Sequence, residues 1–290
     1  MVVLALVDAD SLIYQSLREP FIGSFSVLEE KINTIIESTK CTHISFFLSE
    51  GNYFRKNISD GEYKKNREKT IQKPGVNTLK TFIKEFYHAN TMGEVEADDL
   101  VAYWYNKPLF CIPELDYFAT DCGIKNNEST DESSSYVGVK KIICSVDKDL
   151  LKGIPGTHFN YTYKMQNEEE VIKGHWEENT EEDAQLFLMK QMVVGDHADG
   201  VSGIPKKGEK YWENFYTLKG GEISWGNILN LYTESLGEIN GVIQFGKNFR
   251  MLYTLRNDRD FLREVHAIPP IPNIVRVNNE PKDIEVYGEF

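Results

Sequence analysis

Three carboxylates, Glu96, Asp98 and Asp99, lie within four residues, directly before the apolar run 100–105. Acidic side chains favour the positive first turn of a helix, so the segment is predicted to open a helix over residues 96–106. Positions i and i+3 share a helix face, and we therefore expect Glu96 and Asp99 to point the same way, with Asp98 offset by one step. An acidic first turn is common without any function. Whether this turn binds a cation depends on carboxylates that recur elsewhere in the chain.

Carboxylates also follow each of three predicted strands. The strands are residues 2–7, 43–48 and 140–146, of which the first is a continuous apolar run typical of a buried parallel strand. The acidic residues after them are Asp8 and Asp10, Glu50, and Asp147 and Asp149. Ligands of open α/β sheets bind outside the carboxyl ends of the strands. A fourth strand at 158–163 and intervening helices complete the prediction of an α/β sheet.

A further carboxylate pair lies in the second part of the chain. A helix predicted over residues 184–194 runs into the motif GDHADG, which supplies Asp196 and Asp199, and a hairpin follows before the next helix. We predict an α/β domain over residues 1–178, a helical region with this hairpin over 179–262 and a loosely packed tail over 263–290.

Two segments of the α/β domain differ from the rest. Residues 51–93 are basic, with interleaved aromatic residues, whereas residues 113–138 are rich in Asn, Ser, Asp and Glu and are predicted to be a mobile surface insertion. In the basic segment, Tyr63-Lys64-Lys65-Asn66-Arg67 places phosphate-binding donors beside a stacking ring, which favours a nucleic-acid contact.

Ten acidic residues are candidates for one shared site: Asp8, Asp10, Glu50, Glu96, Asp98, Asp99, Asp147, Asp149, Asp196 and Asp199. Each pair of ionised carboxylates at ~4 Å costs roughly 4 kcal/mol at an effective dielectric near 20, so they cannot share a pocket uncompensated. Divalent cations remove that cost, and all-oxygen ligands favour Mg²⁺ or Mn²⁺ over zinc. Two ions about 3.5–4 Å apart can hold the attacking and the leaving oxygen of a phosphodiester. Such a pocket also reconciles a net charge of -13 with a nucleic-acid partner.

The composition argues against several other classes. The four cysteines show no C-x-x-C spacing, so neither a zinc site nor a disulfide framework is indicated. The apolar start is too short for a signal peptide or a membrane span. We expect a cytoplasmic protein with no membrane partner.

Six motifs occur in the order LVDADSL, LSEGNYFRK, EYKKNR, EVEADDL, CSVDKDL and VGDHADGVSGIPKKGEK. Together, over about residues 4–255, they resemble the flap endonuclease/5′-nuclease superfamily, most closely the small phage 5′→3′ double-strand exonucleases of the gene 6 type. The resemblance implies a PIN-like, mostly parallel sheet flanked by helices. It also implies two-metal hydrolysis of phosphodiesters from the 5′ end of duplex DNA, with flap endonuclease and RNase H activity for primer removal in phage replication. The implied partners are double-stranded DNA, 5′ flaps or RNA/DNA hybrids in the host cytoplasm.

The resemblance also implies roles by position. The tighter metal site would be formed by Asp8, Glu96, Asp98 and Asp147, with Asp99 beside them, and the second by Asp149, Asp196 and Asp199. Glu50 replaces a usual Asp, and Asp10 stands where several members have a neutral residue. Lys64 and Arg67 match the catalytic pair that contacts the scissile phosphate, and Tyr63 matches the ring that stacks on the terminal nucleotide.

Residues 195–215 resemble the helix–hairpin–helix module that grips the duplex backbone through loop amides. The candidate contacts are Gly203, Lys206, Lys207, Gly208 and Lys210, with Lys65 added from the basic segment. Relatives often hold a potassium ion there, but Lys206-Lys207 replaces the usual Gly-Ile, which puts the K⁺ site in doubt and adds two phosphate contacts. The basic segment after Arg67 is shorter than the arch of many relatives. The sequence therefore does not determine whether this segment forms a closed arch through which the 5′ end threads.

Two rival functions fit parts of the sequence. The motif Asp8-Ala9-Asp10 after a strand, with Asp196 and Asp199 later, also resembles haloacid-dehalogenase-type phosphatases, in which the first Asp is a covalent nucleophile. That fold requires a strand before its second acidic motif, whereas residues 184–194 predict a helix. A non-catalytic DNA-binding relative with a decayed metal site is the other alternative, and the intact carboxylates argue against it.

Overall fold

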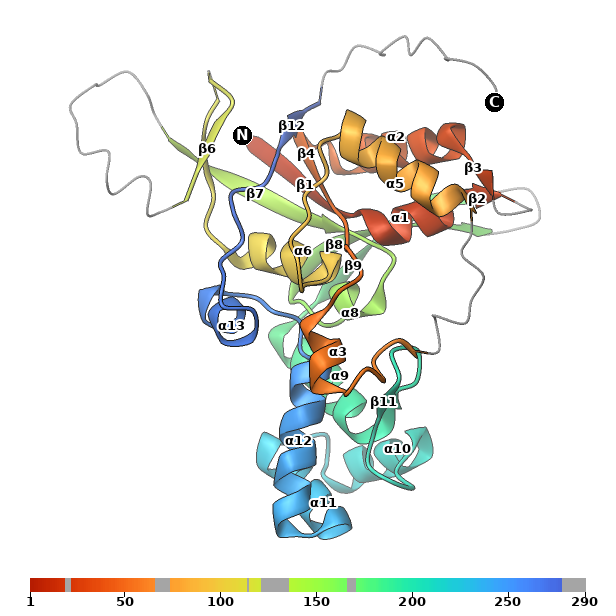
Figure 1. Cartoon of the computed structure of the whole chain (residues 1–290), viewed down its shortest axis with the longest axis vertical. Helices are drawn as coiled ribbons and strands as arrows, with labels where there is room; N and C mark the ends of the chain where they lie inside the picture. Colours follow the sequence, from red (N-terminus) through yellow and green to blue (C-terminus); the bar gives the residue numbers. More distant parts are fainter. Residues whose placement is uncertain (19–21, 66–73, 114, 121–135, 166–170, 278–290) are drawn as a thin grey trace, which may run out of the picture.

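The computed structural model describes residues 1–18, 22–65, 74–113, 115–120, 136–165 and 171–277. In these residues a twisted sheet with helices on both faces forms one half of the molecule, and a group of C-terminal helices forms the other (Figure 1). No helix in the described ranges is long and apolar enough to cross a membrane.

Four parallel strands form the centre of the sheet. In spatial order they are β4 (His43–Phe47), β1 (Val2–Asp8), β7 (Val137–Cys144) and β8 (Gly156–Met165). Antiparallel strands extend this group, namely β12 (Val275–Arg276) on β4, β9 (Val171–Asn179) on β8, and β5 (Phe110–Ile112) with β6 (Tyr117–Ala119) on β7. The predicted α/β fold with a parallel sheet is confirmed.

Strand β1 is buried on both faces, and its alternate residues enter two different cores. Even-numbered residues pack in the core shared with α6 (Ala97–Asn106) and α8 (Lys148–Leu151). Odd-numbered residues pack in the core shared with α1 (Ala9–Gln15), α2 (Phe25–Thr39) and α5 (Pro74–Phe86). Both faces of the strand therefore require apolar side chains, which explains the uninterrupted apolar run.

The C-terminal helices enclose a third core. Its elements are α9 (Glu181–Val194), α10 (Glu209–Leu218), α11 (Trp225–Leu236) and α12 (Glu238–Leu252). A hairpin of β10 (Gly195–Asp196) and β11 (Val201–Ser202) joins α9 to α10; it contains the GDHADG motif, whereas the sequence predicts a hairpin after that motif. The remaining elements are α3 (Phe54–Ile58), α13 (Asp258–Glu264) and the hairpin of β2 (Leu17–Arg18) and β3 (Ile22–Gly23).

The tail differs from its prediction. The sequence predicts loose packing of the tail 263–290, but α13 extends to Glu264 and β12 adds an antiparallel strand at the edge of the sheet. The carbonyl oxygen of Asn273 accepts a hydrogen bond from the Ser45 hydroxyl at 2.7 Å, and its N–H donates to the Asn90 side chain at 2.7 Å. Of the predicted insertion 113–138, the described ends form β6 and the start of β7. Residues 121–135 and 278–290 lie outside the described residues.

Candidate active site

Three strands end at the same edge of the sheet, as the sequence predicts. In the parallel ladders, Val7 lies beside Cys144 of β7, and Asp8 lies beside Phe47 of β4. The chain that follows β7 therefore continues next to Asp8, and the Ser145 hydroxyl donates a hydrogen bond to Asp8 Oδ2 at 3.0 Å. This edge of the sheet carries the candidate site.

Three of the predicted ligands occupy the N-cap positions of helices. Asp8 caps α1, Asp147 caps α8 and Glu96 precedes the first turn of α6. The Asp8 and Asp147 side chains accept hydrogen bonds from backbone N–H groups of the first turn. Local capping therefore fixes both carboxylates at the sheet edge.

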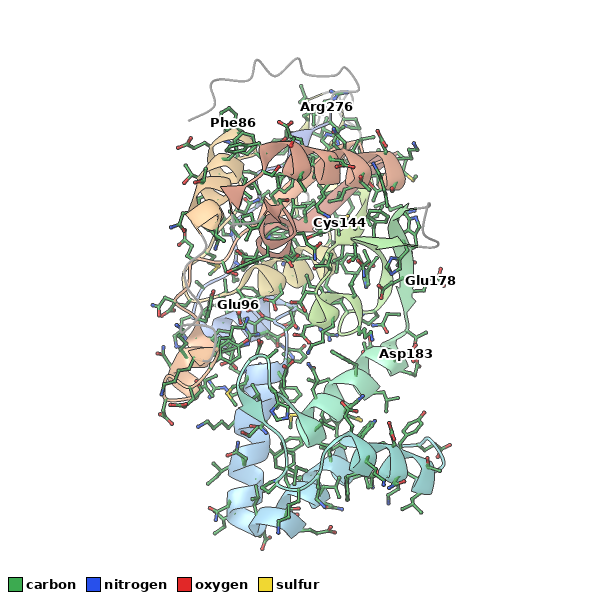
Figure 2. All side chains as sticks on the ribbon, turned by 90° about the vertical axis from the view of Figure 1, so that its right-hand side faces the viewer. Phe86, Glu96, Cys144, Glu178, Asp183 and Arg276 are labelled. Atoms are coloured by element: carbon green, nitrogen blue, oxygen red, sulfur yellow. The ribbon has the colours of Figure 1, made fainter. Side chains whose placement is uncertain are left out.

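Carboxylates from four segments of the chain converge beyond this edge. We call the group the acidic basin, and its members are Asp8, Glu96, Asp98, Asp147, Asp149, Asp196 and Asp199. Four of the seven line one small pocket together with Tyr63 and Gln191. Figure 2 shows Glu96 at the junction between the sheet and the C-terminal helices. The basin therefore lies between the two halves of the molecule.

Burial and mutual repulsion disturb the protonation of the basin. Burial, together with the charges of Glu96 and Asp99, raises the pKa of Asp98 well above its ordinary value. Burial and the charge of Asp147 raise the pKa of Asp149 to about 6. Burial likewise raises the pKa of Asp147. The ionised forms of these carboxylates are therefore unfavourable unless a cation neutralises them.

A buried arginine, which the sequence analysis did not single out, holds Asp99. Arg55 is 2% exposed, and its two terminal nitrogens donate to the two Asp99 oxygens at 2.6 and 2.7 Å. Its other N–H groups donate to Glu96 Oε2 at 3.1 Å and to the carbonyl oxygens of Met251 and Tyr253 at 3.0 and 2.9 Å. All five N–H donors of the guanidinium are therefore used.

This ion pair revises the role predicted for Asp99. Glu96 and Asp99 do face the same way, as expected from their spacing, because both contact Arg55. Asp99 is fully buried, and its carboxylate also accepts the backbone N–H groups of Glu96 and Leu255. Asp98 is the member of this turn that lines the pocket. The Asp99 carboxylate therefore connects α6 to α3, through Arg55, and to the chain that follows α12, through Leu255.

Asp10 and Glu50 also have protein cations as partners. Lys80 Nζ lies 2.9 Å from Asp10 Oδ1, and Lys84 Nζ lies 3.2 Å from Glu50 Oε1. Both lysines belong to α5. The Glu50 side chain is 44% exposed. These two predicted ligands therefore lie at the rim beside α5, and we do not include them in the basin.

The structure corrects the role predicted for Tyr63. Its ring is 3% exposed and packs with Val201 and Met251, so no face is open to a nucleotide. Its hydroxyl lies 2.8 Å from Glu96 Oε2 and 2.9 Å from Asp199 Oδ2. Tyr63 therefore bridges the two carboxylate groups that were assigned to different cations.

The neighbouring basic residues face different environments. Lys64 Nζ contacts the Glu96 carboxylate and lies 3.6 Å from Asp199 Oδ2, so it brings a positive charge to the basin. Burial opposes ionisation of Glu96, but the charges of Lys64 and Arg55 outweigh it and lower the pKa of Glu96. Lys65 pairs with the exposed Glu62 at 2.6 Å. The predicted contact Arg67 lies outside the described residues.

Two glycines allow the hairpin to fold tightly against α9. A Cβ on Gly203 would lie 2.3 Å from the carbonyl oxygen of Val193, and a Cβ on Gly195 would lie 2.4 Å from the Gly203 nitrogen. Gly195 also has φ +88°, which favours glycine. No larger residue fits at either position, and the hairpin holds Asp196 at the basin as a result.

The predicted backbone contacts lie on the loop after this hairpin. Lys206 and Lys210 are exposed, Gly208 precedes α10, and Lys207 is half-buried with Nζ 4.1 Å from the centre of the Tyr211 ring. Lys206 has φ +65°, a left-handed conformation. The two adjacent lysines therefore lie at the N-terminal end of α10.

Replacing Tyr63 with Phe tests the corrected role. Y63F keeps the ring but removes the hydroxyl that contacts Glu96 and Asp199, and partners of metal ligands typically contribute 10–100-fold to metal affinity or activity. We expect the Mg²⁺-dependent activity that the motifs imply to fall by about tenfold or more in limiting Mg²⁺. A stacking residue would be unaffected, since Phe stacks as well as Tyr. Unchanged Mg²⁺ dependence in Y63F would restore the original assignment.

The donor set fits a hard divalent cation. Glu96, Asp98 and Asp99 each offer a carboxylate oxygen within 4.8 Å of the others, and the basin members are all oxygen donors. Mg²⁺ and Mn²⁺ prefer such ligands. Because Asp99 is paired with Arg55, the carboxylates best placed to bind the cation are Glu96 and Asp98, together with Asp8 and Asp147 at the sheet edge.

Comparisons with known proteins agree with this description. No protein-family model matches the chain, and no curated protein sequence matches it. A variant of the bacteriophage T5 flap endonuclease, solved with DNA and metal ions, superposes with a TM-score of 0.54 at 16% identity over 87% of this chain and 89% of its own. A variant of the T5 5′-exonuclease gives 0.50 at 17% identity over the same shares. The chain therefore shares the fold of these T5 enzymes, which agrees with the mostly parallel sheet flanked by helices that its motifs predict.

Proposed function

We propose that this chain is a divalent-metal-dependent 5′→3′ nuclease that hydrolyses phosphodiesters from the 5′ end of duplex DNA. The acidic basin carries the proposal, because four segments of the chain bring buried, mutually repelling carboxylates together, and three of these segments line one pocket. Carboxylates arranged in this way are suited to Mg²⁺ or Mn²⁺. A protein of the same fold was solved with DNA and metal ions.

We further propose that the basin holds two cations. Asp8, Glu96, Asp98 and Asp147 would hold the first, and Asp149, Asp196 and Asp199 the second. When bound, the cations would neutralise these carboxylates and stabilise negative charge on the reacting phosphate. Tyr63, whose hydroxyl contacts Glu96 of the first group and Asp199 of the second, would fix the distance between the two groups.

The chain's own cations would orient the substrate. The Lys64 side chain is 17% exposed at the basin, where its ammonium can stabilise charge that develops on the scissile phosphate. Arg67 is proposed as its partner from the motif alone. The exposed lysines at the start of α10 would bind the duplex backbone away from the reacting bond.

Replacing Lys206 and Lys207 with Ala tests the backbone contact. If each lysine neutralises one phosphate, the double variant should reduce the log–log salt slope of duplex binding by about 2. Fluorescence anisotropy with labelled duplex in EDTA measures the slope without cleavage. K40A, at the opposite edge of the sheet, is the control. A salt slope equal to that of the wild type would mean that these two lysines, on the loop after the hairpin, do not touch phosphate.

The finer activities call for a substrate comparison. We propose exonuclease action on duplex ends, with flap endonuclease activity and RNase H activity on RNA/DNA hybrids. A blunt duplex, a nicked duplex, a 5′ flap and a 5′-RNA hybrid, each labelled at the 5′ end, should give short 5′-terminal products in Mg²⁺ and none in EDTA. Product length on each substrate then separates exonuclease from flap action. Intact substrates in Mg²⁺ would contradict the proposal.

The phosphatase alternative makes an opposite prediction. It requires a strand before Asp196, whereas the whole segment Glu181–Val194 is helix α9. It also gives no role to Glu96 or Asp98, which line the basin with Asp196. Hydrolysis of p-nitrophenyl phosphate without cleavage of DNA would favour that alternative.

A further inference from the structure

One polar side chain is buried in the last turns of α9. Among the buried residues of this helix Gln191 is the only polar one, and the others are Ala184, Leu188, Met189, Met192 and Val193. Gln191 is 7% exposed and lines the pocket of the acidic basin. Burying an amide among apolar residues costs free energy unless its hydrogen bonds are made, so its partners are informative.

The Gln191 amide bridges two carboxylates from different elements. Its Nε2 donates to Asp149 Oδ1 at 2.8 Å and to Asp196 Oδ2 at 3.2 Å. An amide nitrogen carries two N–H groups, and an ionised carboxylate only accepts, so one amide satisfies both partners. Asp149 belongs to α8, and Asp196 belongs to β10 of the hairpin.

Lys148 contacts the same two carboxylates but is a different kind of partner. Its Nζ contacts Asp196 and lies 3.4 Å from Asp149 Oδ1, and its side chain is 48% exposed. A half-exposed ammonium on a flexible stem can leave when another cation arrives. The Gln191 side chain is fixed by the packing of α9, and its neutral amide does not repel a cation. Gln191 can therefore stay in place whatever the charge of the site.

We propose that Gln191 is a positioning residue for the second cation group, Asp149, Asp196 and Asp199. Its amide holds Asp149 and Asp196 at the spacing at which both bind one divalent cation. The inference rests on the proposed function, because it assumes that this group binds a cation. Gln191 is assigned no contact with substrate. Residues that orient metal ligands typically contribute 10–100-fold to affinity.

Direct Mn²⁺ binding, followed by electron paramagnetic resonance of the free ion, tests the proposal. Wild-type protein should bind two Mn²⁺, and Q191L should bind one of them about 10–100-fold more weakly while the other is unchanged. The Mg²⁺ concentration for half-maximal cleavage should rise by the same factor, with the rate in saturating Mg²⁺ within about threefold of wild type. Q185L is the control, since Gln185 is exposed on the same helix and bonds to Glu181 instead.

Q191N keeps the test decisive should Q191L fail to fold. Asn retains the amide but is one methylene shorter, so it cannot span both carboxylates, and we expect it to weaken the same ion. Wild-type Mn²⁺ affinities in the folded variants would overturn the positioning role while leaving the nuclease assignment intact. Wild-type protein that binds no Mn²⁺ and cleaves no DNA would overturn the proposed function itself.

Discussion

Replacing Asp98 with Asn is expected to reduce Mg²⁺-dependent cleavage by at least about 10³-fold, equivalent to roughly 4 kcal/mol of barrier. Asn has the size of Asp but lacks its charge, and Asp98 is the pocket-lining carboxylate of the α6 turn. Its loss would remove a ligand from the proposed first cation group. Cleavage of the 5′-labelled duplex under single-turnover conditions measures the effect.

The same variant should be more stable than wild type when no cation is present. Burial and the charges of Glu96 and Asp99 raise the pKa of Asp98 in the folded protein. A carboxyl with a raised folded pKa destabilises the protein as pH rises above its unfolded pKa of about 3.9. In EDTA at neutral pH we expect D98N to gain about 1–2 kcal/mol, or roughly 2–6 °C in Tm. The gain should vanish near pH 4.

An exposed carboxylate supplies the control for both measurements. The Asp60 side chain is 88% exposed, so D60N removes the same charge without touching the basin. It should leave cleavage unchanged and Tm almost unchanged. Cleavage by D98N within tenfold of wild type would remove Asp98 from the cation site.

Replacing Arg55 with Met should give the largest loss of stability. Removing one partner of a buried ion pair typically costs 3–5 kcal/mol because the other charge is stranded. Here the stranded group would be Asp99, which is fully buried. We expect Tm to fall by roughly 6–20 °C in thermal unfolding monitored by circular dichroism. K173M is the control, because the Lys173–Glu30 pair is exposed and such pairs contribute about 0–1 kcal/mol.

A double variant separates the stranded charge from lost packing. R55M/D99L removes both charges, so much of the stability lost in R55M should return. Recovery should be incomplete, because the backbone N–H groups of Glu96 and Leu255 also lose their acceptor. A double variant less stable than R55M would mean that Asp99 stabilises the fold independently of Arg55.

The sequence predicts the scaffold of the site well, because strand ends and helix caps are local features. An apolar run that ends in Asp8 is both a buried strand and an N-cap. The antiparallel strand β9 was not predicted, and neither were the short antiparallel strands β5, β6 and β12. They contain only two or three residues each, and their pairing depends on neighbours distant in the chain.

Side-chain direction is what the sequence does not predict. Asp98 and Asp99 are adjacent, yet one lines the pocket and the other is held by Arg55. The partner comes from α3, and nothing in the local sequence of either segment indicates the pair. Tyr63 similarly reads as a stacking ring beside basic residues, but tertiary packing buries it. The polar Gln191, among the apolar buried residues of α9, is a signal of a polar neighbour that the sequence does contain.

Anomalous diffraction from crystals soaked in Mn²⁺ tests the central claim most directly. Two anomalous peaks should lie in the acidic basin, one among Asp8, Glu96, Asp98 and Asp147 and the other among Asp149, Asp196 and Asp199. Peaks at other places on the protein, or an empty basin in crystals of enzyme that cleaves DNA in Mn²⁺, would contradict the claim that these carboxylates hold the catalytic cations.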